Sequence, residues 1–221
     1  TVDGKEIPYQ IDDLDGNGTN DELCFLVDLE GKQAKTATIT LSDKANDKQW
    51  KARTFAEMVL RNPKVKEKNK HDIYLSSITI DKRTTNPYNV LHHHGVAFES
   101  ELIAMRIYMD KRQTIDLYGK FHKGLELEQT QFYTSKEQKA QGYGDDVLWV
   151  GNTFGLGAFR GWNGTEPTLL EDVKHRTQRI LTTGPLRTIV EVEDNQWTIT
   201  PGAEPVNATI RYTLYAGHRD F

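Results

Sequence analysis

The chain has 221 residues, of which 37% are hydrophobic, and a formal net charge of −4. This length allows one large β domain or two small ones. The negative charge argues against nucleic acid as a partner, because nucleic-acid binding depends on basic patches that neutralise phosphates. No apolar run is long enough to span a membrane, and the single cysteine, Cys24, excludes an internal disulfide.

An aspartate-rich loop follows the first predicted strand, which covers residues 7–11. Its oxygen-bearing groups fall at alternating positions: Asp13, Asp15, Asn17, the backbone carbonyl of Thr19, and Asp21. The spacing resembles the DxDxDGxxD calcium loops of integrin-type β-propellers, and Ca²⁺ prefers about six to eight oxygen ligands. A plain hairpin turn is the alternative, because Asp, Asn and Gly form tight turns without a metal. Even with calcium bound, we expect a structural role.

Further strands are predicted at residues 23–29, 36–41, 53–60 and 73–80. Residues 53–60 contain helix formers, but the neighbouring segments are strand-like, and we assign a strand there. The first of these segments is strongly apolar and is expected to be buried.

Residues 92–120 combine the most chemically able side chains with the clearest strand pattern. Apolar and polar residues alternate from residue 101 to residue 110, which is the period of two of a strand. One face is nearly all apolar and should meet a core. The other face places Arg106, Tyr108 and Asp110 towards solvent or a ligand. A polar turn and a second alternation at residues 114–118 complete a predicted β-hairpin.

The rest of the chain continues this pattern, with strands predicted at 125–133, 146–150, 169–173, 177–182, 186–192, 196–200 and 208–216, and a loop at 135–144. The glycine-rich segment 151–157 is no nucleotide loop, because neither a helix nor a lysine–serine pair follows it. About a dozen short strands with polar turns predict an all-β sandwich. We expect a single domain over residues 1–221 that continues, in the natural protein, beyond Phe221.

Several motifs together resemble the domain-of-unknown-function family 4861: the aspartate-rich loop, residues 98–101, 106–108, 116–120, 150–157 and 184–187. The resemblance spans most of the chain. It implies a relation to the galactose-mutarotase-like β-supersandwich fold and an occurrence beside bacterial polysaccharide-degradation enzymes. It also implies a periplasmic or secreted location and family members longer than this chain. That fold hosts epimerases, polysaccharide lyases and non-catalytic domains, so it fixes no activity.

Mutarotase-like sites place a histidine and a carboxylate on the concave sheet, and the resemblance implies the same here. Candidate acids are His93 and His94, and candidate bases are Glu99 and Glu101. The candidate substrate-binding residues are His92, Arg106, Tyr108, Lys120, Trp149, Trp162 and Arg187. Strict alternation turns both glutamates away from Arg106, so only a bulge or a loop up to Glu101 would bring them together. The alternative is a surface turn of histidines, with the glutamates paired to arginines.

Two functions that involve a glycan remain open, and a third alternative is a protein-interaction domain, which would show an apolar patch and no polar pocket. The first is an enzyme that acts on a hexose or a uronic-acid-containing glycan by histidine–glutamate acid–base chemistry, with epimerisation, β-elimination and hydrolysis all possible. The second is a non-catalytic glycan-binding or accessory module, stapled by a calcium loop and presenting Trp149 or Trp162 to a sugar ring. The partner is an oligosaccharide or a sugar acid in both, with calcium as the one expected cofactor and no organic cofactor. Zinc on the histidines is less favoured, because adjacent histidines on a strand diverge and no third ligand is evident.

Overall fold

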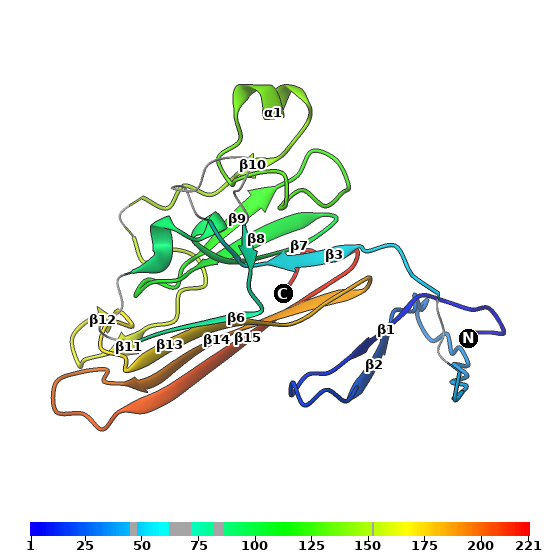
Figure 1. Cartoon of the computed structure of the whole chain (residues 1–221), viewed down its shortest axis with the longest axis horizontal. Coiled ribbons are helices and arrows are strands. Elements are labelled where there is room, and N and C mark those ends of the chain that lie inside the picture. The colour runs from blue at the N-terminus through cyan, green and yellow to red at the C-terminus, as the bar shows by residue number, and fades with distance from the viewer. Residues whose placement is uncertain (45–47, 62–71, 82–85, 152) are drawn as a thin grey trace.

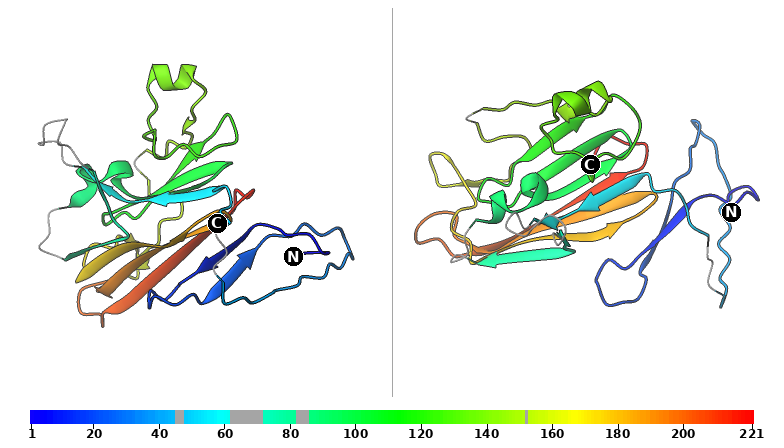
Figure 2. Two further views of the ribbon diagram at one scale, coloured as in Figure 1. Left: turned by 45° about the vertical axis from the view of Figure 1, so that its right-hand side comes forward. Right: turned by 45° about the horizontal axis from the view of Figure 1, so that its top comes forward.

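Two antiparallel sheets form the body of the structure, a computed structural model that describes residues 1–44, 48–61, 72–81, 86–151 and 153–221 (Figure 1). The strand order of the five-stranded sheet is β10 (Asp145–Asp146), β9 (Ile115–Gly119), β8 (Ile103–Tyr108), β7 (Gly95–Ser100), β3 (Thr54–Glu57). The order of the four-stranded sheet is β15 (Val206–Tyr215), β14 (Arg187–Trp197), β13 (His175–Thr183), β6 (Ser77–Asp81). The sheets stack face to face, as an all-β sandwich (Figure 2).

Smaller elements surround the sandwich. Three two-stranded pairs are β1 (Tyr9–Asp12) with β2 (Glu22–Phe25), β4 (Val59–Leu60) with β5 (Ile73–Tyr74), and β11 (Gly161–Trp162) with β12 (Pro167–Thr168). The helical segments among the described residues are η2 (Pro87–Asn89), η3 (His92–His94) and α1 (Lys136–Ala140). None of the helices in the described parts of the chain is long and apolar enough to cross a membrane.

The core between the sheets is built by the alternation that the sequence shows. Met105 and Ile107 of β8 are fully buried and pack against Val190 and Val192 of β14 and Leu214 of β15. Burial of such side chains stabilises the fold by about 1.5–3 kcal/mol each. The two sheets therefore share one apolar layer, and the outer face of each sheet lies outside this core.

The outer face of the four-stranded sheet is a charged surface. Arg179 of β13 pairs with Glu191 and Glu193 of β14, and Arg211 of β15 pairs with Glu191 across the next ladder. Both arginine side chains are at least one-third exposed, so solvent screens these pairs. In contrast, the outer face of the five-stranded sheet is covered by the loops and short helix between β9 and β10 (Figure 1).

Most of the long predicted strands are confirmed. Residues 53–60 form β3 and β4, and the segments 177–182, 186–192 and 208–216 lie in β13, β14 and β15. The predicted strand at 73–80 is split into β5 and β6, and residues 196–200 form only the end of β14.

Other sequence predictions are wrong, and most of them concern the covering loops. Residues 125–133, 169–173 and 36–41 form no strand, and the segment 23–29 is a strand only to Phe25 and is partly exposed. The loop 135–144 contains α1, because Ser135 and Gln138 form a capping box. β10 ends at Asp146, and the residues after it lie largely exposed rather than buried.

The β1–β2 hairpin docks on the sandwich through buried polar groups. The side-chain oxygen of Gln10 accepts hydrogen bonds from the backbone amides of Leu186 and Arg187, each at 3.0 Å. The Arg187 guanidinium donates to Asp12 at 2.8 Å and to Glu22 at 2.7 Å. Arg187, a predicted substrate-binding residue, is therefore held between two carboxylates of the hairpin.

Replacing Arg187 with methionine should loosen this docking, because Asp12 would remain buried without its cation. Loss of one partner of a buried ion pair costs about 3–5 kcal/mol. We expect faster amide hydrogen exchange in β1 and β2 of Arg187→Met. The matched control is Arg211→Met on the exposed charged face, with an expected change in unfolding free energy of about 0–1 kcal/mol. Equal exchange in the two variants would contradict the docking role.

Candidate functional site

A row of side chains crosses the covered face of the five-stranded sheet. The strand registers place Glu57 opposite Ala97, Ala97 opposite Arg106, and Arg106 opposite Asp116. Side chains directly opposite on neighbouring strands share a face and contact each other. The small methyl group of Ala97 leaves space above β7. This space is filled by the histidine turn η3 and by the segment between β9 and β10, residues 120–144, which we call the covering loop.

The turn between β7 and β8 removes the difficulty that strict alternation raised. The strands separate at residues 101–102, so Glu99 pairs with Ala104 and lies on the same face as Arg106. Arg106, Tyr108 and Asp116 accordingly come together on this face. Glu101 does not join them, because it lies in the turn, where Arg53 donates to it at 2.8 Å.

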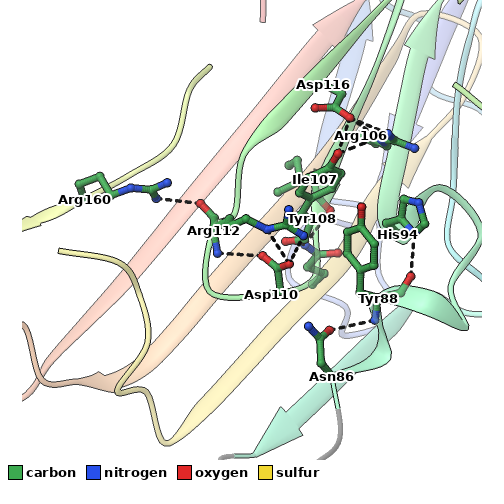
Figure 3. Close-up of polar contacts among 11 residues, drawn as sticks. Asn86, Tyr88, His94, Arg106, Ile107, Tyr108, Asp110, Arg112, Asp116 and Arg160 are labelled. Carbon is green, nitrogen blue, oxygen red and sulfur yellow. Dashed lines mark hydrogen bonds and ion pairs between the residues drawn. The ribbon is translucent and has the colours of Figure 1, made fainter. Parts of the chain in front are cut away.

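Arg106 is the centre of a buried polar cluster (Figure 3). Its guanidinium donates to Asp116 at 2.8 and 2.6 Å and to the hydroxyl of Tyr133 at 2.9 Å. It also lies over the ring of Phe132, 4.6 Å from the centroid. The hydroxyl of Tyr108 donates to the same Asp116 oxygen at 2.7 Å. We refer to Arg106, Tyr108, Asp116 and Tyr133 as the Arg106 cluster.

Burial and the neighbouring groups hold Tyr108 as a neutral phenol and Arg106 as a cation. Burial and the hydrogen bond to Asp116 raise the pKa of Tyr108, so its hydroxyl remains a donor. Burial lowers the pKa of Arg106, but the charge of Asp116 more than offsets this and raises it overall. Arg106 is thus a charged group with little exposed surface, and it orients Asp116 and the hydroxyl of Tyr133.

A second group, the Tyr88 stack, adjoins Tyr108. Tyr88 and His94 stack with centroids 3.8 Å apart, and Nδ1 of His94 lies 2.7 Å from the Tyr88 carbonyl oxygen. Arg112 lies over the rings of Tyr88 and Tyr108, at 4.9 and 4.6 Å, and forms an ion pair with Asp110 (Figure 3). Burial lowers the pKa of His94, which favours the neutral imidazole.

Exposed aromatic rings lie at the other side of the Arg106 cluster. Tyr133 is 51% exposed in spite of its anchored hydroxyl. Trp149 is 83% exposed, and its ring centroid lies 6.3 Å from that of Tyr133. Trp162 is also exposed but belongs to the separate β11–β12 hairpin. An exposed pair of large rings beside fixed polar groups is a surface that favours a flat, partly apolar ligand.

Glu99 and Lys120 form a buried ion pair that has a structural role. The Glu99 carboxylate accepts hydrogen bonds from the backbone amides of Glu126 and Leu127, at 2.9–3.0 Å. Lys120 donates to Glu99 and to the carbonyl oxygens of Ser100 and Gly124, at 2.7 and 2.6 Å. Burial raises the pKa of Glu99 against the lowering effect of Lys120. All these partners hold the covering loop onto the sheet.

His92 and His93 are buried, with 4% and 3% of their surfaces exposed. Nδ1 of His92 lies 2.5 Å from Oε1 of Glu57, and Nε2 of His93 lies 3.2 Å from the same oxygen. Burial raises the pKa of Glu57, but its bonds to the two histidines more than offset this and lower it overall. The three consecutive histidines therefore divide between two environments: His92 and His93 with Glu57, and His94 with Tyr88.

The aspartate-rich loop connects β1 to β2 and is exposed. Asp13, Asp15 and Asp21 each offer a carboxylate oxygen, and these oxygens lie within 4.8 Å of one another. Backbone amides of the loop donate to Asp13 and Asp21, as Gly18 does to Asp13 at 2.7 Å. The side-chain amide of Asn17 donates to Asp15 at 2.9 Å, and its side-chain oxygen accepts a hydrogen bond from the backbone amide of Thr19. The donor set suits a hard cation such as Ca²⁺.

Sequence reasoning missed five residues of these clusters: Glu57, Tyr88, Arg112, Asp116 and Tyr133. Asp116 had a signal, because it alternates with core residues in the predicted hairpin. Glu57 had none, since the histidines that it contacts lie 35 or more residues further along the chain. Tyr133 was assigned to a strand that does not exist.

The fold and the site define the class of this protein. It is an all-β sandwich in which loops cover one sheet face, and this face carries buried ion pairs and exposed aromatic rings. The chain belongs to the family described as Domain of unknown function (DUF4861), whose model matches residues 1–221. This match confirms the family resemblance drawn from the sequence. Comparison with curated proteins and with solved structures found no match.

Replacing Lys120 with methionine should destabilise the protein, because Glu99 would stay buried without its cation. The expected loss of unfolding free energy is about 3–5 kcal/mol, measured by urea denaturation. Lys111→Met is the matched control, since Lys111 forms an exposed pair with Glu171, and about 0–1 kcal/mol is expected there. A loss of the same small size in both variants would argue against Glu99 and Lys120 as the clamp of the loop.

Proposed function

We propose that this chain is a carbohydrate-active protein that holds a hexose or uronic-acid-containing glycan on the covered face of the five-stranded sheet. The observation that carries the proposal is the Tyr133–Trp149 pair, exposed to solvent and anchored through Arg106 beside Tyr108 and Asp116. Sugar rings have an apolar face and a polar rim. A site for them therefore combines an aromatic platform with fixed hydrogen-bonding groups.

The Tyr88 stack extends this site towards an acidic sugar. The guanidinium of Arg112 is partly exposed and lies over two rings, so it can form a charge-assisted bond with a carboxylate. A cavity of about 260 Å³ adjoins it, lined among others by Asn86, Lys111 and Arg112. This is below the ~300–1,000 Å³ of most small-molecule pockets, so the cavity fits one end of a glycan. The lining is of mixed charge, because Asp81, Asp110 and Glu171 lie in it with Lys111, Arg112 and Arg176, so it offers hydrogen bonds to a neutral or an acidic sugar.

The wider role follows from the family resemblance rather than from the geometry. We place the chain with the galactose-mutarotase-like proteins, in bacterial polysaccharide utilisation, in the periplasm or secreted. The β-sandwich supports this placement without distinguishing it from other sandwiches. In this role the chain binds an oligosaccharide or a sugar acid.

A catalytic role at the same site is the second candidate. It is favoured by the hydrogen bond of 2.7 Å from Tyr108 to Asp116 and by His94, whose ring centroid lies 6.1 Å from that of Tyr108. These groups provide an acid and a base within one site. Glu99 is less suited to that role than Asp116, because both of its oxygens already accept hydrogen bonds, whereas Arg106 and Tyr108 donate to one and the same oxygen of Asp116. His93, which is buried, and Glu101, which lies in the turn away from Arg106, are also less suited as the acid or the base.

The aspartate-rich loop is part of the proposal as a calcium staple of the β1–β2 hairpin. Asp13, Asp15, Asn17, the carbonyl of Thr19 and Asp21 would supply oxygen ligands. A bound ion would replace the hydrogen bonds that now hold these carboxylates and would screen their mutual repulsion.

Titration of the protein with neutral and uronic-acid oligosaccharides, followed by NMR over time, tests the glycan site. We expect Trp149→Ala to weaken binding about tenfold or more, the equivalent of about 1.4 kcal/mol. Trp162→Ala is the matched control, an exposed tryptophan on the other hairpin, and should bind as the unmodified chain does. New covalent signals or faster anomer exchange would favour the catalytic candidate. Silence across the panel, or equal losses in both variants, would contradict the glycan proposal.

Calcium should protect the β1–β2 hairpin. In the presence of Ca²⁺ we expect slower amide exchange at residues 13–21, because a bound ion would hold the loop more firmly than the hydrogen bonds of the loop alone. Asp15→Asn removes one charged ligand and should reduce the effect, whereas Asp3→Asn outside the loop should keep it. Exchange that does not respond to Ca²⁺ in the unmodified chain would leave a plain hairpin turn as the correct interpretation.

A further inference from the structure

Glu57, His92 and His93 form a buried cluster that the proposed glycan site does not use. Each residue offers one ligand atom, and these three atoms lie within 4.8 Å of one another. The carbonyl oxygen of Leu127, from the covering loop, lies 3.0 Å from Nε2 of His93. Two imidazoles, one carboxylate and one carbonyl therefore meet at one place. They come from β3, from η3 and from the loop that closes the sheet.

The backbone of η3 makes this convergence possible. On a regular strand His92 and His93 would point to opposite faces. Here His93 has a φ of 57°, in the left-handed region that a non-glycine residue rarely adopts. As a result the two rings lie with centroids 3.8 Å apart, tilted by 35°. The reason to expect diverging histidines from the sequence does not hold in the folded chain.

The cluster has more ring nitrogens than hydrogen-bond partners. Nδ1 of His92 and Nε2 of His93 share one oxygen of Glu57. The other two nitrogens, Nε2 of His92 and Nδ1 of His93, are buried and have no hydrogen-bond partner among the described residues. These two nitrogens point away from Glu57, so the atoms that can hold an ion are Nδ1 of His92 and Nε2 of His93, which converge on the Glu57 carboxylate.

We propose that Glu57, His92 and His93 bind a zinc-class dication, with the Leu127 carbonyl as a fourth oxygen donor. Two histidines and one glutamate form a ligand set that zinc uses in proteins, and the buried, closed setting here suits an ion that holds structure. Calcium does not fit, because it takes oxygen ligands only. Ligand atoms around a tetrahedral zinc lie about 3.3 Å apart. The spacings of 2.5, 3.2 and 3.0 Å found here require only small side-chain rotations.

A metal ligand must be a neutral imidazole or a carboxylate, and the cluster supplies two imidazoles and one carboxylate. The ion would join β3, η3 and the covering loop. It would therefore stabilise the part of the five-stranded sheet beneath the glycan site without contacting a glycan bound there.

The test is titration of the chelator-treated full chain with Zn²⁺ and Co²⁺, in excess Ca²⁺ to occupy the aspartate-rich loop. We expect one equivalent of Zn²⁺ per chain by calorimetry, and visible Co²⁺ absorption of the intensity that four-coordinate sites give. At a zinc concentration of about a hundred times its Kd, Tm should rise by about 5–10 °C. Glu57→Gln and His92→Ala should lose this equivalent. His94→Ala, the neighbouring histidine that does not contact Glu57, and Asp15→Asn should keep it.

A second measurement serves if the cluster variants fail to fold. Two-dimensional NMR of the histidine ring nitrogens in the unmodified chain should show shifts at His92 and His93 on addition of Zn²⁺, and no shift at His218. The proposal is overturned if no equivalent binds, or if Glu57→Gln binds as the unmodified chain does. It is equally overturned if only exposed histidines shift. Because none of these readouts uses a sugar, the result is independent of the glycan proposal.

Discussion

The Glu99 carboxylate is the group on which the functional face depends. It lies on β7 with no exposed surface and takes the backbone amides of Glu126 and Leu127 together with the ammonium group of Lys120. Those amides would otherwise need partners in a ladder. By taking them, Glu99 holds the covering loop in an irregular path. That path brings Phe132 and Tyr133 over Arg106, and the Leu127 carbonyl to His93.

The same interaction explains which parts of the fold can be predicted from the sequence. β8, β13, β14 and β15 follow the alternation of apolar residues because each has one face in the common core. The covering loop has a similar alternation at residues 125–133 but no strand, since its amides bind a side chain. Periodicity records which residues are buried. It does not record whether a buried backbone pairs with another backbone or with a carboxylate.

The candidate site was predicted in its location but not in its roles. Arg106 and Tyr108 do lie on one chemically loaded face, as the hairpin pattern indicates. However, Arg106 is paired with Asp116, and so it orients Tyr133 instead of reaching solvent. Glu57 joins His92 only through the pairing of β3 with β7, a long-range register that no local pattern contains. Roles in such a site depend on partners that are distant in the sequence.

The docking of the β1–β2 hairpin also has a consequence for the order of folding during synthesis. Asp12 contacts Arg187 across 175 positions of the chain. At about 5–20 residues per second, a ribosome needs roughly 10–35 s to make that interval. For this time the β1–β2 hairpin has no β14 to dock on, and Asp12 stays hydrated. The hairpin is synthesised before β14 but joins the sandwich only after β14 has formed.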